Sequence, residues 1–381
     1  MKRFFISHNG CEPTAFDAQR IERTLLSHGA VRCSTSSEAD VVVFLGCTFT
    51  REKELELERE IESLLKNESF RLIVIAGCFL AHYRNDERLH FVRTGDVANF
   101  LQPHLIEGDP LNDDVARLGQ TQAASGDKPI ITISDGCYGS CTFCSIKTVR
   151  GTHKSRPIRE ILADIAVVSD SARTLKLTGI EVAGYGLDCG YSLAWLLKQI
   201  HHDFPRLCIE LGSMNPKLLK RMPEADLEIL GADFVTGNFH FPLESASSKV
   251  LRDMQRGYSW EDYADLWQRL SRAGVTSFST DLIAGFPTES AQDHQASLRF
   301  LDEYRLEFAQ LFFFEPRPGT EAAAMPGHPR DLRVDRMLEL LAHYSATYML
   351  ARGLEMNALV SGAVSLPFNT NLNLNNEELI A

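Results

Sequence analysis

The sequence lacks long apolar runs. No stretch approaches the roughly 18 consecutive apolar residues of a membrane-spanning helix. The first residues, MKRFFISH, hold no apolar core of the kind that a signal peptide requires. We therefore expect a cytoplasmic protein with no membrane partner. The nine cysteines of such a chain are better explained as metal ligands or buried thiols than as disulfides.

An excess of positive charge is also missing. The chain has 39 Lys and Arg against 51 Asp and Glu, a formal net charge of −12. Non-specific binding of nucleic acid is built from Lys and Arg, so this balance argues against broad contact with a phosphate backbone. We find no internal repeat. With 381 residues, 44% of them hydrophobic, the chain has ordinary globular composition and room for two or three domains.

Short apolar runs alternate with helical patterns along the chain, which predicts an α/β fold. In residues 1–117 the β-branched runs favour a small doubly wound parallel sheet. Residues 118–129 are polar and read as a linker. Six further βα units over residues 130–353 predict a complete or partial β/α barrel. Residues 354–381 form a tail. Its last residues, NTNLNLNNEELIA, are rich in Asn, which predicts either a disordered end or an added edge strand.

A compact thiol motif opens the second domain in the stretch DGCYGSCTFCSIKTVRG. It places Cys137, Cys141 and Cys144 four and then three residues apart. A structural zinc site usually takes four ligands, whereas three thiolates leave one corner of a metal centre open. Iron–sulfur clusters are held by cysteine thiolates, so these loop thiols predict a 4Fe–4S cluster with one open iron. The competing interpretation, buried cysteine as a small hydrophobe, fits this tight spacing poorly.

Three more Gly-Cys steps close the strands of the first domain, at Cys11, Cys47 and Cys78. The carboxyl ends of neighbouring parallel strands lie side by side, so these strand-end thiols are expected to converge. They form a second candidate set of three ligands for a 4Fe–4S cluster, although buried free cysteine remains an alternative for them. The remaining cysteines lack this pattern and are interpreted as structural: Cys33, Cys189 and Cys208.

Together these motifs resemble those of the radical S-adenosylmethionine (SAM) enzymes, and more narrowly those of the methylthiotransferases. The loop motif resembles the family's C-x3-C-x2-C segment. LTGIEVAGYGLD, FHFPLESASSKVLRDMQRGYS, TDLIAGFPTES and FEPRPGTEAAAM resemble later family segments in the same order. Glu244 stands for the family's Gln, and Ala246 for its Gly. The 28 residues after the last predicted helix, Leu354 to Ala381, are too few for the family's usual C-terminal TRAM domain, which we expect to be missing.

The resemblance implies roles for particular residues. The two sets of thiols would hold two 4Fe–4S clusters and serve as the catalytic and metal-binding residues. Four residues would contact SAM: Phe143, Glu181, Ser213 and Glu244. Four others lie in motif loops and are candidates for positioning substrate: Asp17, Arg150, Tyr185 and Arg317. For each of these residues a plain packing or loop role is the alternative.

The expected function is methylthiotransfer to a peptide, a protein side chain or a small molecule, with a flavodoxin-type or ferredoxin-type protein as electron donor. The negative charge and the missing TRAM domain place tRNA second as substrate. Further alternatives are a radical SAM enzyme that inserts sulfur or oxidises without methylthiolation, and an iron–sulfur electron carrier that is not an enzyme.

Overall fold

The computed structural model describes residues 3–47, 51–66, 72–78, 86–105, 128–352 and 368–370. The chain divides into two compact units. The first comprises residues 1–138, 146–180 and 203–207, and the second comprises 139–145, 181–202 and 208–381. Across the described ranges, no helix is both long and apolar enough to span a bilayer.

A five-stranded parallel sheet forms the start of the first unit. Its strand order is β2-β1-β3-β4-β5, in which every neighbouring pair is parallel. The strands are β1 (Arg3–His8), β2 (Val31–Arg32), β3 (Val41–Gly46), β4 (Leu72–Gly77) and β5 (Leu89–Phe91). The predicted parallel sheet is therefore confirmed. The sequence analysis missed the short edge strands β2 and β5.

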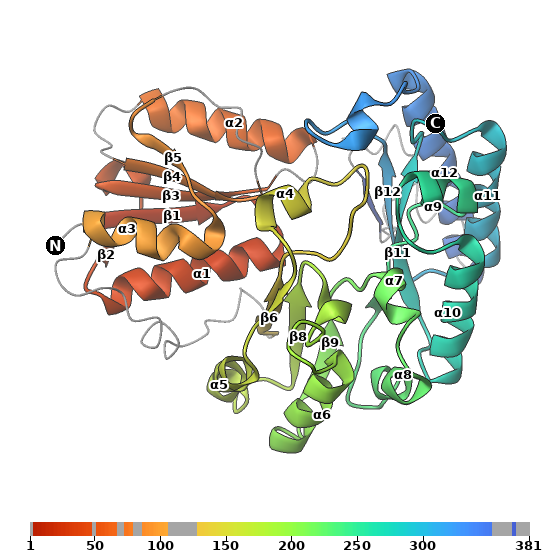
Figure 1. Ribbon diagram of the computed structural model, residues 1–381, viewed down its shortest axis with the longest axis horizontal. Coiled ribbons are helices and arrows are strands. Elements are labelled where there is room, and N and C mark those ends of the chain that lie inside the picture. Colours follow the sequence, from red (N-terminus) through yellow and green to blue (C-terminus); the bar gives the residue numbers. More distant parts are fainter. Residues whose placement is uncertain are drawn as a thin grey trace. The chain divides into compact units, whose positions relative to one another are not determined.

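Helices cover both faces of this sheet (Figure 1). Alternate residues of β3 point to opposite faces, as in any strand. Val41, Val43 and Leu45 pack in one core with α1 (Glu12–Ser27) and α3 (Val97–Leu105). Val42 and Phe44 pack in a second core with α2 (Arg51–Lys66). The strands carry continuous apolar runs because both of their faces are buried.

The first unit also holds the opening strands of the second predicted domain. Strand β6 (Ile130–Asp135) pairs with β8 (Thr174–Gly179) in parallel and with β7 (Lys154–Ser155) in antiparallel orientation. Helices α4 (Ile146–Arg150) and α5 (Ile158–Val168) lie between these strands in sequence. Helix α1 packs against β6 and β8 as well as against the first sheet.

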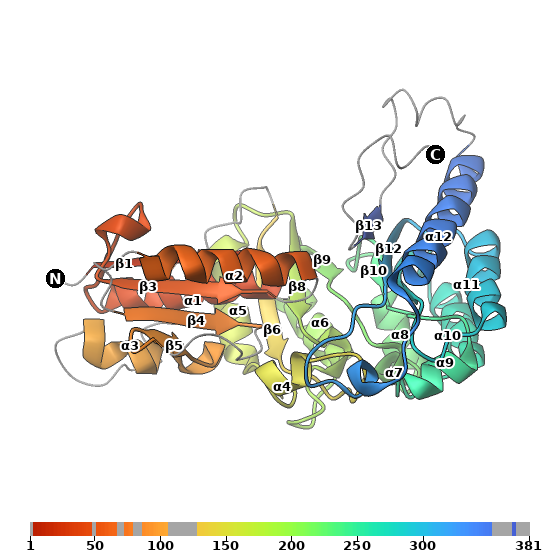
Figure 2. The same cartoon turned by 90° about the horizontal axis from the view of Figure 1, so that it is seen from above.

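The second unit is built on a parallel sheet of order β10-β11-β12-β13. Its strands are β10 (Phe239–His240), β11 (Phe278–Ala284), β12 (Phe308–Phe313) and β13 (Phe368–Thr370), and β9 (Cys208–Leu211) precedes them. Its helices are α6 (Leu193–Asp203), α7 (Pro216–Leu219), α8 (Glu224–Leu230), α9 (Ser248–Asp253), α10 (Trp260–Arg272), α11 (Ala291–Glu303) and α12 (Arg330–Ala351). Strand β13, at the start of the Asn-rich stretch, lies beside β12 (Figure 2), as the edge-strand alternative requires.

Some expectations were wrong or fall outside the described residues. The strand expected at residues 234–237 is reduced to a single bridge between Ile209 and Val235. Glycine at position 237 takes a φ of +87°, which ends the extended backbone there. Most of the predicted linker, residues 118–127, and most of the tail lie outside the described residues. The domain boundaries thus remain predictions.

Candidate iron–sulfur site

The strand-end thiols follow β1, β3 and β4, which are adjacent in the sheet. Backbone contacts fix two of them. The Cys47 N–H donates to Asn9 Oδ1 at 2.8 Å, and the Cys78 N–H donates to the Gly46 carbonyl at 2.9 Å. The side chains of Cys47 and Cys78 are buried, while Cys11 is exposed. The fold thus brings residues 31 or more positions apart to one edge of one sheet.

The environment of these thiols favours the thiolate at one position and opposes it at another. A hydrogen bond from Cys47 and another from Thr14 lower the pKa of Cys11 to about 6, against the opposing effect of burial. Burial raises the pKa of Cys78, and the nearby Arg150 guanidinium opposes that rise. The strand-end thiols therefore include one thiol with a lowered pKa, Cys11, and one beside a buried cation, Cys78.

Arg150, at the end of α4, donates hydrogen bonds to one thiol, two carboxylates and one hydroxyl of this region. Its Nε donates to Cys78 Sγ at 3.2 Å, and its Nη1 donates to Asp17 Oδ2 at 2.7 Å and to Asp135 Oδ1 at 3.2 Å. Its Nη2 donates to Thr14 Oγ1 at 3.3 Å. The side chain is only 2% exposed. Arg150 and Asp17, predicted to position substrate, therefore face each other inside the first unit.

The loop thiols lie on the segment that follows β6. Cys137 belongs to the first unit, where its N–H donates to the Gly151 carbonyl at 3.2 Å. Cys141 and Cys144 belong to the second unit, where the Cys144 N–H donates to the Cys141 carbonyl at 3.2 Å in a tight turn. Gly136 has a φ of +69°, and a Cβ there would stand 2.3 Å from the Thr152 carbonyl oxygen. Glycine before Cys137 is thus a steric requirement of this loop.

A second buried arginine, Arg256, donates a hydrogen bond to one of the loop thiols. Arg256 Nη1 donates to Cys141 Sγ at 3.2 Å, and its Nε donates to the Tyr258 hydroxyl at 2.9 Å. Arg256 Nη2 also lies 3.5 Å from Glu244 Oε1. Burial raises the pKa of Glu244 to about 7, against the opposing charge of Arg256. Glu244, predicted to contact SAM, and Cys141 therefore both contact the same arginine, Arg256.

The other three residues predicted to contact SAM lie in the second unit. Glu181 is 2% exposed, and Asn215 Nδ2 donates to its Oε2 at 3.4 Å. The Ser213 carbonyl accepts from the Val182 N–H at 3.4 Å, so the loops that carry Glu181 and Ser213 are adjacent. Phe143 is half-buried against an apolar cluster that includes Phe286. The contact of these three residues with SAM stays a prediction.

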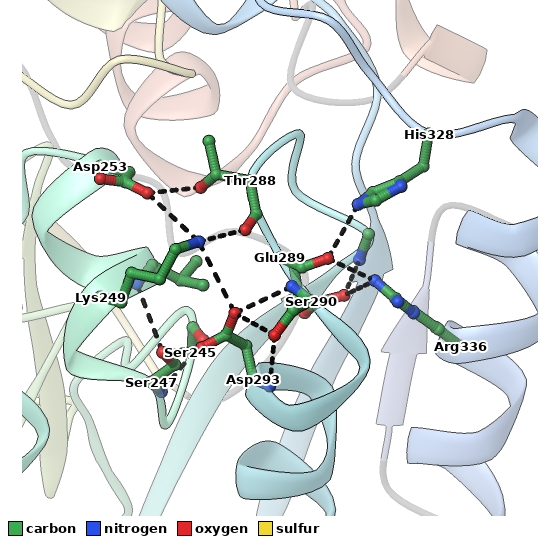
Figure 3. A network of polar contacts seen from close by, with 12 residues as sticks. Ser245, Ser247, Lys249, Asp253, Thr288, Glu289, Ser290, Asp293, His328 and Arg336 are labelled. Carbon is green, nitrogen blue, oxygen red and sulfur yellow. Dashed lines mark hydrogen bonds and ion pairs between the residues drawn. The ribbon is translucent and has the colours of Figure 1, made fainter.

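The segment GFPTES carries a polar network in the second unit (Figure 3). Glu289 Oε2 accepts from Arg336 Nη1 at 2.7 Å and from the Gly285 N–H at 2.8 Å. Asp293 Oδ1 accepts from the Ser247 hydroxyl at 2.5 Å. The Lys249 ammonium donates to the Thr288 carbonyl. These contacts hold the loop between β11 and α11 against α9 and α12 with side chains from the sequence motifs.

The donor chemistry of both thiol sets fits an iron–sulfur cluster. All nine cysteines are free thiols, so none is withdrawn into a disulfide. Each set holds a buried arginine within 3.2 Å of one sulfur, and hydrogen bonds and cations at the sulfurs stabilise an anionic cluster. Within the described ranges, no group of three His, Cys, Asp or Glu side chains is arranged as a site for a metal ion.

Sequence reasoning missed several members of these sites. Arg256 lies in the quoted segment QRGYS, but nothing in its spacing pointed to Cys141, 115 residues away. Asp135 and Asn9 each precede a Gly-Cys step. Polar residues are common in such loops, so their position in the sequence does not mark them as part of a site. Their contacts depend on which strands are neighbours, which the order of motifs does not give.

Two family models match the chain. Residues 3–95 match the model described as "Uncharacterized protein family UPF0004", and residues 131–301 match the radical SAM superfamily. The first match spans the strand-end thiols and the second spans the loop thiols.

Two curated relatives come from Aquifex aeolicus (strain VF5). A tRNA-2-methylthio-N(6)-dimethylallyladenosine synthase is 30% identical over 89% of this chain and 82% of its own length. The threonylcarbamoyladenosine tRNA methylthiotransferase MtaB is 26% identical over 86% of this chain and 84% of its own length. Both similarities run through both units.

A solved structure shares the fold. The radical SAM methyltransferase TsrM from Kitasatospora setae superposes with a TM-score of 0.58 over 84% of this chain and 77% of its own, at 12% identity. The α/β fold expected from the sequence is confirmed at this level. The family's cofactors are SAM and two 4Fe–4S clusters, as the thiol motifs and the family resemblance together predict. The chain belongs to the radical SAM methylthiotransferase family.

Proposed function

We propose that the chain replaces a hydrogen on a modified adenosine of tRNA by a methylthio group. The observation that carries the proposal is the 30% identity, over 89% of the chain, to a synthase named for a 2-methylthio adenosine product in tRNA. The second relative is also named for an adenosine of tRNA, one with a different modification. The relatives therefore favour tRNA over the peptide or small-molecule substrate that the sequence analysis ranked first.

In this proposal each set of thiols holds one cluster. When bound, the clusters and SAM supply the electron, the radical chemistry and the methyl and sulfur atoms that the protein itself lacks. The chain's own residues orient and shield these groups. Arg150 fixes Cys78 through a charge-assisted contact of 3.2 Å, and Arg256 does the same for Cys141. Glu181, buried at a strand end, is the proposed acceptor for the ammonium group of SAM.

The test is an anaerobic assay of the reconstituted protein. Unmethylthiolated tRNA, SAM and a reductant are supplied, and the digested nucleosides are analysed by mass spectrometry. We expect an adenosine derivative heavier by one methylthio group in place of one hydrogen. Substrate tRNAs carrying the dimethylallyl or the threonylcarbamoyl modification, used separately, identify which adenosine is accepted. Cleavage of SAM with every tRNA left unmodified would refute a tRNA substrate.

A peptide, protein side chain or small molecule remains the second candidate. The formal net charge of −12 favours it, because RNA binding gains affinity from Lys and Arg. The same assay separates the two, since this candidate predicts SAM cleavage that no tRNA stimulates. A flavodoxin-type or ferredoxin-type protein is the proposed physiological reductant in either case.

A further inference from the structure

A cavity of about 400 Å³ lies in the first unit. Two of its lining carboxylates, Asp17 and Asp135, accept from Arg150, which also contacts Cys78. Helix α1, the turn before α3, strands β6 and β7 and the start of α5 line the cavity. Its volume falls within the roughly 300–1,000 Å³ typical of small-molecule sites. Apart from Asp17, a candidate for positioning substrate, the lining residues have no part in the proposed reaction.

Two cations at the cavity form no hydrogen bond or salt bridge in the described part of the chain, although the charge of Arg20 acts on the nearby Asp17. The guanidinium of Arg20 makes no hydrogen bond or ion pair there, and neither does the ammonium of Lys154. Arg23 also lines the cavity, and burial lowers its pKa, with the charge of Asp164 opposing and those of Arg156 and Arg20 adding to that effect. The cavity is thus lined by four cationic side chains, Arg20, Arg23, Lys154 and Arg156, beside four carboxylates.

The carboxylates that line the cavity are largely matched by arginines. Asp164 accepts from Arg156 Nη2 at 2.8 Å. Asp17 and Asp135 both accept from Arg150, which lies outside the lining. Glu160 is the fourth carboxylate of the lining. The two charged side chains of the lining that form no hydrogen bond or salt bridge with any described residue, Arg20 and Lys154, are thus both positive.

A buried hydroxyl without a partner also lines the cavity. Strand β6 alternates, so that Ile131 and Ile133 enter the core while Thr132 and Ser134 face the cavity. Thr132 is 6% exposed, and its Oγ1 has no hydrogen-bond partner. Such an orphaned group costs folding free energy, so it calls for a ligand or another explanation.

We propose that this cavity binds a phosphate group. Arginine and lysine side chains match the charge and geometry of phosphate oxygens, and a hydroxyl adds a neutral donor. The phosphate belongs either to a free small molecule such as a nucleotide or to the backbone of an RNA. The inference does not depend on methylthiotransfer, because binding is measured without turnover.

The test measures binding to the reconstituted full-length protein by isothermal titration calorimetry at low salt. The probes are inorganic pyrophosphate, AMP and adenosine. We expect AMP and pyrophosphate to bind and adenosine, which has no phosphate, to bind at least 10-fold more weakly. Arg20→Gln and Lys154→Met should each weaken AMP binding about 10-fold. Arg299→Gln is the matched control, because Arg299 is an exposed helix arginine of the second unit.

Thr132→Val gives a readout that a structural role would not mimic. It removes the orphaned hydroxyl, so we expect an unchanged or higher melting temperature together with several-fold weaker AMP binding. A single-stranded RNA oligonucleotide without a terminal phosphate shows whether the bound phosphate belongs to RNA or to a small molecule. If the oligonucleotide displaces AMP from the wild type but binds the Arg20→Gln variant more weakly, the cavity binds an RNA backbone. If it does not displace AMP, the cavity binds a free small molecule. The proposal is overturned if neither phosphate probe binds, or if binding is indifferent to both Arg20→Gln and Lys154→Met.

Discussion

Burial of a carboxylate at Glu289 makes stability depend on pH. Burial raises the pKa of Glu289 from 4.5 to about 7, although the Gly285 N–H and Arg336 oppose the rise. The folded chain then binds more protons here than the unfolded chain between these two values. The contribution of Glu289 to the free energy of unfolding is therefore fully present below about pH 4.5 and is lost as the pH rises through about 7.

Glu289→Gln should remove this dependence. Gln keeps the shape and still accepts from the Gly285 N–H, but it does not titrate. We expect the wild type to lose on the order of 2–3 kcal/mol of stability between pH 5 and pH 8 relative to the variant. Denaturant unfolding of both proteins at the two pH values measures the difference. Parallel pH profiles for the two proteins would show that Glu289 stays ionised beside Arg336 throughout.

At the scale of an element, the ends of β3 and β4 constrain the site by close backbone contact. Gly77 has a φ of +92°, and a Cβ there would stand 2.4 Å from the Gly46 carbonyl oxygen. Gly77→Ala should therefore destabilise the protein by about 2–4 kcal/mol and displace the adjoining thiols. Gly29→Ala is the matched control, because Gly29 shares a positive φ of +82° but has open space around it. Melting temperatures should fall clearly less for the control; equal losses would exclude the backbone clash as the cause.

The elements also show what the sequence could predict. The buried runs of β1, β3 and β4 and the acidic pattern of α2 were recognisable because periodicity and burial are local properties. The Gly-Cys steps predicted one set of strand-end thiols because parallel strands end at the same edge. Arg256 beside Cys141 and Arg150 beside Cys78 were not predictable in this way. Each contact joins distant segments, and only the packing of the whole unit determines which side chains meet.

For the whole molecule, the central question is how many clusters the nine thiols hold. The strand-end thiols and the loop thiols account for six, each set with its own arginine, and Cys33, Cys189 and Cys208 stand apart from both. A buried arginine beside each set offsets the negative charge that an anionic cluster brings into the protein. Two clusters per chain would explain why a buried arginine contacts a cysteine sulfur in both sets, Arg150 at Cys78 and Arg256 at Cys141.

Iron and sulfide counts on anaerobically reconstituted protein test this arrangement. The triple variant Cys11→Ala, Cys47→Ala and Cys78→Ala should bind about four fewer irons per chain than the wild type, because a 4Fe–4S cluster loses its ligands. The matched control replaces the other three thiols, Cys33, Cys189 and Cys208, by alanine and should keep the full count. Equal iron in the wild type and the first variant would leave the sulfur of the methylthio group without a source in the first unit. Loss of iron in both variants would point to general damage to the fold, which circular dichroism of the two proteins would reveal.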